Sequence, residues 1–385
     1  MEEVLFVKFG LAFELSVPRP FTGTAEQDVY RRSLEQARLG DQLGFDQAWV
    51  VEHHFMEEYS HSSGPDLFLA AIAAMTERIR VCHGIVVCVP EINPVIRVAE
   101  RAAVLDVLSG GRLEFGTGRS ATWTELGGFG VDPEETKKTW DEYVRVLPKM
   151  WTQERFSYSG RSFSMPERAI LPKPVQKPHP PMWVAVTAPG TELDAADRGL
   201  GSYGVSLSST LSDQEKRIAE YRRRIQLCDP VGEFVNEQVN TVNFLYCHED
   251  EEVALNTGQQ LVTGFSSAAA QVLDIRDSYP TASYRAPGLL SAIRQDIGAP
   301  TEGKRRPEAL CYGTPDQIEQ SLRRWESVGV DRVVFMVNYL EVIEQSAVLE
   351  SMKLFAREVM PRFGVNGFEL AAPTLNGSRL VETLS

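Results

Sequence analysis

The chain alternates short apolar runs with longer amphipathic runs along most of its 385 residues. Short runs rich in β-branched and aromatic residues predict strands, and runs with apolar residues three and four apart predict helices. The predicted strands cover residues 5–13, 45–51, 79–89, 112–116, 182–187, 202–207, 238–247 and 331–337. Both faces of these strands are apolar, which is typical of parallel strands buried between layers.

A predicted helix follows each of these strands. The helices cover residues 24–43, 66–75, 94–108, 134–151, 189–198, 212–227, 315–328 and 343–360. The first ends at Gly44, the residue type that most often caps a helix. About eight strand–helix units predict an α/β fold that closes into a (β/α)8 TIM barrel with insertions. An open, doubly wound parallel sheet is the structural alternative.

Three segments do not fit the repeat. Residues 154–172 are aromatic and polar and predict a hairpin, whereas residues 256–307 are too long for an ordinary connection. Long insertions in compact domains often act as lids. We therefore expect one barrel domain over residues 1–363 with these two insertions, the second a lid, and a C-terminal tail over 364–385.

The net charge and the cysteine pattern exclude several classes of protein. Lys and Arg number 39 and Asp and Glu 53, so the net charge of −14 would repel nucleic acid. No apolar stretch approaches the roughly 20 residues that cross a membrane. The start Met1-Glu2-Glu3 is acidic, unlike a secretion signal, and the five cysteines are scattered. We expect a cytoplasmic protein with reduced thiols.

The sequence Glu52-His53-His54 stands where the second predicted strand ends. In a (β/α)8 barrel this is the C-terminal rim, which carries the catalytic groups. Histidine changes its charge near neutral pH, so these residues are candidates for proton transfer. A solvated polar loop is the alternative. Side chains of adjacent extended residues point to opposite faces, and no HExxH occurs, so we expect no metal.

Two further segments could bind a phosphate. Gly116-Thr117-Gly118-Arg119-Ser120-Ala121 matches GxGxxG/A, but the glycines that follow are a poor helix start, so we interpret it as a rim loop that carries Arg119. Residues 187–192 follow the fifth strand and open a helix, whose first amides favour anions. Ordinary helix capping is an equal alternative. Lys137 would add positive charge nearby.

Several motifs together resemble the luciferase-like flavin monooxygenase family. The resemblance begins at Glu52-His53-His54-Phe55 and covers about residues 5–363. Further motifs that carry it are Gly44-Phe45-Asp46, Gly111-Arg112-Leu113-Glu114-Phe115-Gly116, Pro181-Met182-Trp183-Val184-Ala185 and Tyr312-Gly313-Thr314-Pro315.

The family has a (β/α)8 fold, and its catalytic members bind reduced FMN and react it with O2. The resulting C4a-peroxyflavin oxidises an organic substrate by Baeyer–Villiger-type insertion or hydroxylation. By resemblance, His53 is the catalytic histidine, with Glu52 and His54 as its neighbours. Arg119 corresponds to the arginine that holds the FMN phosphate, and Lys137 to a second basic position.

The resemblance also assigns the remaining cofactor contacts. Thr187, Ala188, Gly190 and Thr191 lie in the phosphate-binding turn, where Thr187 replaces an acidic residue and Ala188 a serine. Gly84 and Ile85 occupy a position where the family often has a non-prolyl cis peptide beside the flavin ring. Gly118 stands where luciferases have a reactive cysteine, which argues against light emission. Val86, Val87, Cys88 and Trp123 are expected to wall the site.

The expected partners are a small or medium organic substrate, O2 and a separate NAD(P)H:flavin reductase that delivers reduced FMN. The resemblance also predicts a homodimer formed through the second and third helices, where Ala70, Ala71, Ala73 and Ala74 permit close approach. The alternatives are a deazaflavin-dependent oxidoreductase that transfers hydride, a non-catalytic partner subunit like luciferase beta, and, most distant, a zinc hydrolase.

Overall fold

A computed structural model describes residues 7–120, 122–188, 190–205, 210–274 and 307–365. Most of the predicted lid, from residue 275 to 306, and the tail from residue 366 lie outside the described residues. The expectations for those segments therefore stay predictions.

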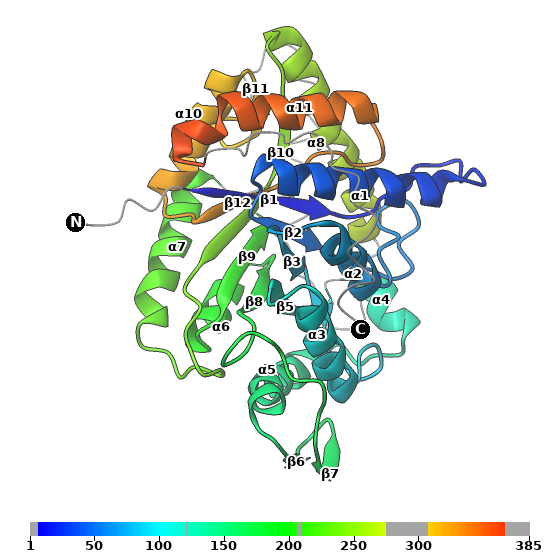
Figure 1. The fold of residues 1–385 in the computed structure, drawn as a ribbon, viewed down its shortest axis with the longest axis vertical. Coiled ribbons are helices and arrows are strands. Elements are labelled where there is room, and N and C mark those ends of the chain that lie inside the picture. The colour runs from blue at the N-terminus through cyan, green and yellow to red at the C-terminus, as the bar shows by residue number, and fades with distance from the viewer. Residues whose placement is uncertain (1–6, 121, 189, 206–209, 275–306, 366–385) are drawn as a thin grey trace, which may run out of the picture.

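Eight parallel strands close into a barrel in the order β1-β2-β3-β5-β8-β9-β10-β12, and β12 pairs with β1 (Figure 1). The strands are β1 (Lys8–Phe13), β2 (Gln47–Val50), β3 (Arg80–His83), β5 (Leu113–Gly118), β8 (Met182–Val186), β9 (Gly201–Val205), β10 (Val239–Cys247) and β12 (Arg332–Met336). Each overlaps one of the eight predicted strands. The barrel prediction is confirmed, and the open sheet is wrong.

Helices surround the barrel on its outside (Figure 1). They are α1 (Ala25–Leu43), α2 (Pro65–Met75), α3 (Val95–Leu108), α5 (Thr136–Thr152), α6 (Thr191–Asp197), α7 (Leu211–Ile225), α8 (Glu251–Asp274), α10 (Pro315–Ser327), α11 (Gln345–Glu358) and the short 3-10 turn η3 (Met360–Phe363). Gly44 ends α1 with a φ of 94°, a left-handed conformation that glycine adopts without steric cost.

The structure corrects the predicted elements in two places and adds detail in a third. The single strand expected over 79–89 is interrupted at Gly84 and Ile85, after which β4 (Val86–Val87) pairs with β5 alone. The segment after Arg119 does start a helix, α4 (Trp123–Gly128), because the Thr122 side chain accepts from the backbone N–H of Glu125. The first part of the expected lid is the long helix α8, and β11 (Cys311–Gly313) extends the pairing of β10.

The segment 154–172 contains β6 (Phe156–Ser159) and β7 (Ser164–Arg168), which pair antiparallel as a hairpin below the barrel in Figure 1. The predicted hairpin is thus confirmed.

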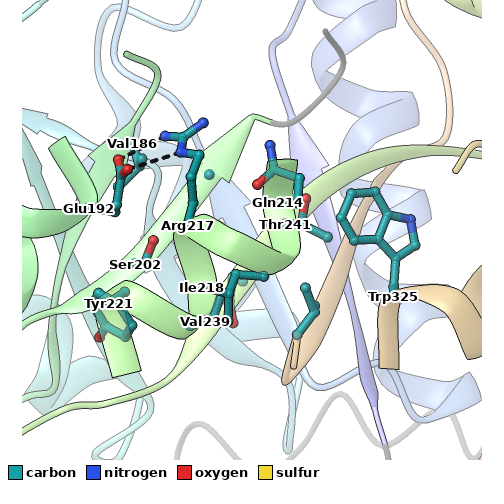
Figure 2. Close-up of a pocket in the computed structure, with 13 residues that line it drawn as sticks. Val186, Glu192, Ser202, Gln214, Arg217, Ile218, Tyr221, Val239, Thr241 and Trp325 are labelled. Carbon is teal, nitrogen blue, oxygen red and sulfur yellow. Dashed lines mark hydrogen bonds and ion pairs between the residues drawn. The ribbon is translucent and has the colours of Figure 1, made fainter. Parts of the chain in front are cut away.

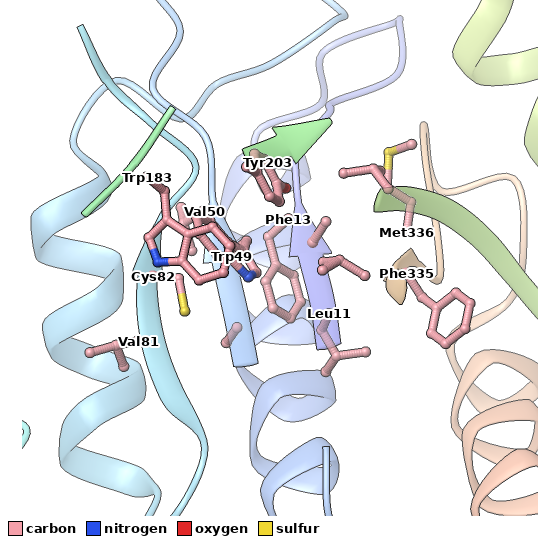
Figure 3. Packing of buried hydrophobic residues seen from close by; sticks show 14 of the residues in the cluster. Leu11, Phe13, Trp49, Val50, Val81, Cys82, Trp183, Tyr203, Phe335 and Met336 are labelled. Atoms are coloured by element: carbon pink, nitrogen blue, oxygen red, sulfur yellow. The ribbon is translucent and has the colours of Figure 1, made fainter. Parts of the chain in front are cut away.

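Aromatic side chains fill the barrel interior (Figure 3). Trp49 stacks on Tyr203 with ring centroids 4.1 Å apart and meets the edge of Trp183 at 5.4 Å. All three side chains are at most 4% exposed. Such large rings contribute several kcal/mol each to the core. The interior is thus packed, and in barrels of this type the catalytic groups lie at the C-terminal end of the strands.

Candidate active site

Strained backbone marks the C-terminal rim of the barrel. Within the described ranges, five non-glycine residues have positive φ: Leu15, Phe55, Ser120, Leu340 and Glu341. Each follows the end of a barrel strand, β1, β2, β5 or β12, within five residues. Such conformations cost about 1–3 kcal/mol each and concentrate at functional sites.

A buried carboxylate holds the imidazole of His53. Glu125 Oε1 lies 3.0 Å from His53 Nδ1 and also accepts from the His54 backbone N–H at 3.1 Å. Its second oxygen accepts from the hydroxyls of Ser120 and Thr122. These four hydrogen bonds fix the Glu125 carboxylate in place. The imidazole of His53 therefore directs Nδ1 to Glu125 and Nε2 to the rest of the rim.

His54 belongs to a different network, as expected for adjacent extended residues. Its Nε2 lies 3.2 Å from Glu52 Oε1, and its ring meets the edge of Phe129 at 5.0 Å. Glu52 also accepts from the backbone N–H of Val87 at 2.7 Å and from the Asn93 amide at 2.7 Å. Glu52 and His54 therefore fasten β4 to the end of β2, and of the three sequence candidates only His53 directs a ring nitrogen to the Glu14 carboxylate.

Nearby carboxylates change the charge of His53. Burial lowers the pKa of His53, but Glu125, by charge and hydrogen bond, and then Glu14 outweigh it and raise the pKa to about 9. The sequence predicted a histidine that titrates near neutral pH; the structure instead favours an imidazolium there. Burial raises the pKa of Glu14 to about 7, against the attraction of His53. Burial also opposes ionisation of Glu125, yet the attraction of His53 and the hydrogen bonds lower its pKa.

The predicted phosphate-binding cations lie along the same rim. Arg119 comes directly before Ser120, and its Nη1 donates to Thr136 Oγ1 at 3.0 Å in the first turn of α5. The neighbouring Lys137 pairs with Asp194 of α6 at 2.7 Å. Arg119, Lys137 and the start of α6 are thus brought together, and Arg119 reaches the His53 group through Ser120 and Glu125.

The turn before α6 differs from the expectation of free helix amides. A carboxylate of this chain already occupies it: Glu192 Oε2 accepts from the Gly190 N–H at 2.9 Å and forms a bidentate pair with Arg217. The Thr191 N–H is bonded to Ala188 O at 3.2 Å, and Thr187 is exposed. Here helix capping is the better description, and an incoming phosphate would have to displace Glu192.

The segment between β3 and β4 also departs from the family pattern. The cis peptide bonds in the described part of the chain all precede prolines, so the Gly84–Ile85 bond is trans. The Gly84 N–H donates to Val50 O at 2.7 Å, which keeps this peptide aligned with β2. Ile85 fills the space next to Gly118, because a Cβ on Gly118 would lie 2.6 Å from Ile85 Cδ1. A side chain at position 118 would therefore require the Ile85 side chain to move.

A small apolar cluster, separate from the main core, covers the rim between β4 and α4. Its buried members are Ile85, Val87, Val89, Leu126 and Val131, with Trp123 and Phe129 packed against them. Of the four expected wall residues, Val87 and Trp123 belong to this cluster, whereas Val86 and Cys88 face the main core. The difference follows from the alternation of side chains along a strand.

A separate cavity lies between the barrel wall and α7 (Figure 2). Glu192 and Arg217 border it on one side and Trp325 on the other. Gln214 Nε2 and Thr241 Oγ1 on its wall have no hydrogen-bond partner among the described residues. The residues of the His53 group do not line it, so it is distinct from the rim site.

Sequence reasoning missed two carboxylates of the site. Glu125 could have been found from Thr122-Trp123-Thr124-Glu125, which fits the capping-box pattern and predicts a helix start with an inward carboxylate. No sequence motif marks Glu14, because it reaches His53 only when β1 and β2 are neighbours in the barrel.

The described residues contain neither a membrane-spanning helix nor a metal-binding cluster. The helices found there are too short or too polar to cross a bilayer. No group of three or more His, Cys, Asp or Glu side chains in those ranges has an arrangement that could hold a metal ion.

A closed barrel whose polar cluster lies at the C-terminal rim has the architecture of a (β/α)8-barrel enzyme. Residues 11–332 match the family described as luciferase-like monooxygenase, and the chain belongs to that family. The match runs from within β1 to the first residue of β12 and includes the His53–Glu125 pair.

Relatives and solved structures agree with the family. The 4-hydroxyprotoasukamycin monooxygenase of Streptomyces nodosus subsp. asukaensis is 38% identical over 86% of each chain. The oxygenase component of the flavin-dependent trigonelline monooxygenase of Acinetobacter baylyi is 24% identical over 88% of this chain and 91% of that protein. The crystal structure of monooxygenase RslO1 from Streptomyces bottropensis superposes with a TM-score of 0.75 at 25% identity, over 93% of this chain and 100% of that one.

Other curated relatives match over a shorter span. The chain covers 51% of the length of two uncharacterized Sinorhizobium fredii proteins, at 36% and 34% identity.

Proposed function

We propose that this chain is an FMN-dependent monooxygenase that uses reduced flavin and O2 to oxidise a small or medium organic substrate, by Baeyer–Villiger-type insertion or hydroxylation. The observation that carries the proposal is the connection through Ser120. Its hydroxyl donates to Glu125, which pairs with His53, and its backbone neighbour is Arg119. One rim thus combines a proton-carrying imidazole with a phosphate-binding cation. The monooxygenase relatives support the same activity.

The rim residues fit an FMN molecule in charge and polarity. Arg119 and Lys137 supply positive charge for a phosphate, and the apolar cluster with Trp123 supplies a surface for a flat aromatic ring. Gly190 leaves open space, since a Cβ there would meet no atom within 4 Å. When bound, reduced FMN supplies the electrons that activate O2. Glu192 and Asp194 oppose the phosphate charge, so we expect weaker binding than the cations alone would give.

The protein's own residues bind, orient and exclude water. Glu125 keeps the proton on Nδ1 of His53, so Nε2 is the nitrogen that gains or loses a proton at the rim. Glu52 fixes β4 through the Val87 N–H and so holds the apolar cluster against the end of β5. A dry surface there protects reactive oxygen chemistry from water.

A separate NAD(P)H:flavin reductase is the proposed partner, in line with the relative that is described as an oxygenase component. We propose a cytoplasmic location, and the five cysteines are all free thiols, as expected in a reducing compartment.

The activity is tested by titrating the purified protein anaerobically with reduced FMN and with a reduced deazaflavin, then admitting O2 in the presence of a panel of ketones and aldehydes. We expect FMN binding and an oxygenated product detected by mass spectrometry. Binding of the deazaflavin alone would favour hydride transfer, and binding of neither would favour the partner-subunit alternative.

Replacing Arg119 by alanine is expected to weaken FMN binding. Loss of a charge-assisted hydrogen bond costs about 1.5–3 kcal/mol, so we expect the dissociation constant to rise roughly 10- to 150-fold. Fluorescence titration measures it. Lys138→Ala is the matched control, because Lys138 is a neighbouring cation that pairs with Glu135 at the surface. Equal affinity in the Arg119 variant and the wild type would remove Arg119 from the phosphate site.

A homodimer formed through α2 and α3 is proposed from the apolar side chains that these helices expose. Leu67 is 79% exposed in the first turn of α2, and Leu108 is 60% exposed at the end of α3, where Val104 and Val107 are also exposed. Of the four alanines expected at this contact, Ala73 is a buried residue of α2 and cannot contact a second subunit.

We expect Leu67→Glu to raise the dimer dissociation constant at least about tenfold, because it replaces about 1.5–3 kcal/mol of apolar burial by a charge. Sedimentation velocity measures the change. Leu227→Glu is the control, since Leu227 is 80% exposed after α7, away from these helices. A monomeric wild type would contradict the proposal.

A further inference from the structure

We propose that Glu14 is a positioning residue for His53, whose carboxylate faces the imidazole Nε2 and governs when the proton on that nitrogen leaves. The inference rests on the proposed function, because it concerns how His53 carries protons during the reaction. Glu14 follows β1 directly and lies on the rim beside the end of β2.

The geometry places a carboxylate on each side of the imidazole. Glu125 occupies Nδ1 at 3.0 Å, and Glu14 Oε2 lies 3.8 Å from Nε2. Glu14 Oε2 is buried and has no hydrogen-bond partner among the described residues. A buried acceptor without a donor is unfavourable unless its environment supplies one. A movement of about 1 Å would bring Nε2 within hydrogen-bond distance.

Within the described ranges, His53 is the cationic group that acts on Glu14. The titratable groups that face it are His53 and Tyr59 after β2, Glu125 of α4, Tyr203 of β9 and Tyr339 after β12. Burial and the charge of Glu125 raise the pKa of Glu14, and His53 lowers it. The charge of Glu14 is therefore linked to that of His53, and the Glu14 carboxyl titrates near neutral pH.

The backbone around Glu14 is fixed in an unusual conformation. Leu15 has a φ of 51°, and its carbonyl accepts from the His61 N–H at 3.0 Å. The Ser60 hydroxyl donates to the Glu14 carbonyl. Both bonds come from the loop that carries His53. A leucine in the left-handed region is unfavourable, and these contacts keep the Glu14 side chain directed to the imidazole.

The proposed step transfers one proton and no electrons. The Nε2–H bond of the imidazolium breaks and an O–H bond forms on Glu14 Oε2, which leaves a neutral imidazole and a neutral carboxylic acid. The reverse transfer restores the imidazolium. His53 can thus accept or deliver a proton at the rim while Glu125 remains ionised on Nδ1.

Glu14→Gln tests the proposal, because the amide keeps the shape and removes the charge. We expect the pKa of His53, followed by NMR of labelled histidine with His53→Gln as the assignment, to fall by about one unit or more. Glu26→Gln is the matched control, since Glu26 pairs with His61 at 2.8 Å on the same loop and is 70% exposed. It should leave the His53 titration unchanged.

Stability against pH gives a second measurement. The native pKa of Glu14 lies above its ordinary value, so ionisation destabilises the fold as pH rises from about 4.5 to 7. Glu14→Gln should therefore raise the melting temperature relative to wild type at pH 8 and leave it equal at pH 4. If Glu14 only supported the fold, Glu14→Gln would lower the melting temperature at both pH values.

The outcomes separate this inference from the proposed function. An unchanged His53 titration in Glu14→Gln overturns the role of Glu14, whatever the activity. A shifted titration together with an unshifted pH profile of product yield overturns its effect on the reaction. Wild-type protein that binds no flavin and yields no product contradicts the proposed function, while the His53 titration still decides whether Glu14 controls that proton.

Discussion

Replacing His53 by alanine is expected to lower the rate of product formation by about a hundredfold or more, while FMN still binds. Proton transfer by a positioned side chain contributes roughly 10²- to 10⁴-fold, and no other imidazole in the described site lies between two carboxylates. Reduced flavin should still react with O2, so hydrogen peroxide should replace product. Product and peroxide are measured together in single-turnover reactions.

His61→Ala is the control for this experiment. His61 lies on the same loop and pairs with Glu26 at the surface, so its loss removes a histidine–carboxylate pair without changing the rim site. We expect product yield near that of the wild type. If His53→Ala gave wild-type yield and no additional peroxide, the imidazole would have no part in the reaction.

Replacing Gly116 by alanine should cause the largest loss of stability. A Cβ at this position would lie 2.0 Å from the carbonyl oxygen of His83, an atom of the β3 backbone. Neither strand can move without breaking barrel pairing, so we expect a destabilisation of about 3 kcal/mol. The midpoint of urea unfolding measures it. The site should be lost as well, since β5 leads directly to Arg119 and Ser120.

Two other glycines provide controls. A Cβ on Gly23 would meet no atom within 4 Å, so Gly23→Ala should leave the unfolding midpoint unchanged or slightly higher. Gly118→Ala would press only on the Ile85 side chain, and we expect a smaller loss than for Gly116. An unfolding midpoint for Gly116→Ala equal to that of Gly23→Ala would show that β3 and β5 can separate.

The barrel was predictable from the sequence because its strands are buried on both faces. Residues such as Val81 and Val333 make the strand segments apolar throughout. Each strand segment is followed by one whose apolar residues have the spacing of a helix. The break at Gly84 was not predictable, because the apolar run over residues 79–89 continues through it, and the nearby contact between Gly116 and the His83 carbonyl joins strands more than 30 residues apart. Likewise, α4 was missed because its glycines outweighed the capping signal at Thr122.

The candidate site was predictable where one motif carries it. His53 and Arg119 follow directly from their positions after strands, and the structure brings them to one rim. Glu14 and Glu125 act on His53 from segments 39 and 72 residues away along the chain, so only the closed barrel shows the contact. The occupied turn at Gly190 depends on Arg217 of α7 in the same way.

The packing of Ile85 against Gly118 limits how this chain can evolve. A side chain gained at position 118 collides with Ile85, and a smaller residue gained first at position 85 leaves a void beside the apolar cluster. Each single substitution is therefore unfavourable, although the pair together could be tolerated. Lineages of this family that differ at one of these positions should differ at both, and laboratory selection for a thiol here should start from a double mutant.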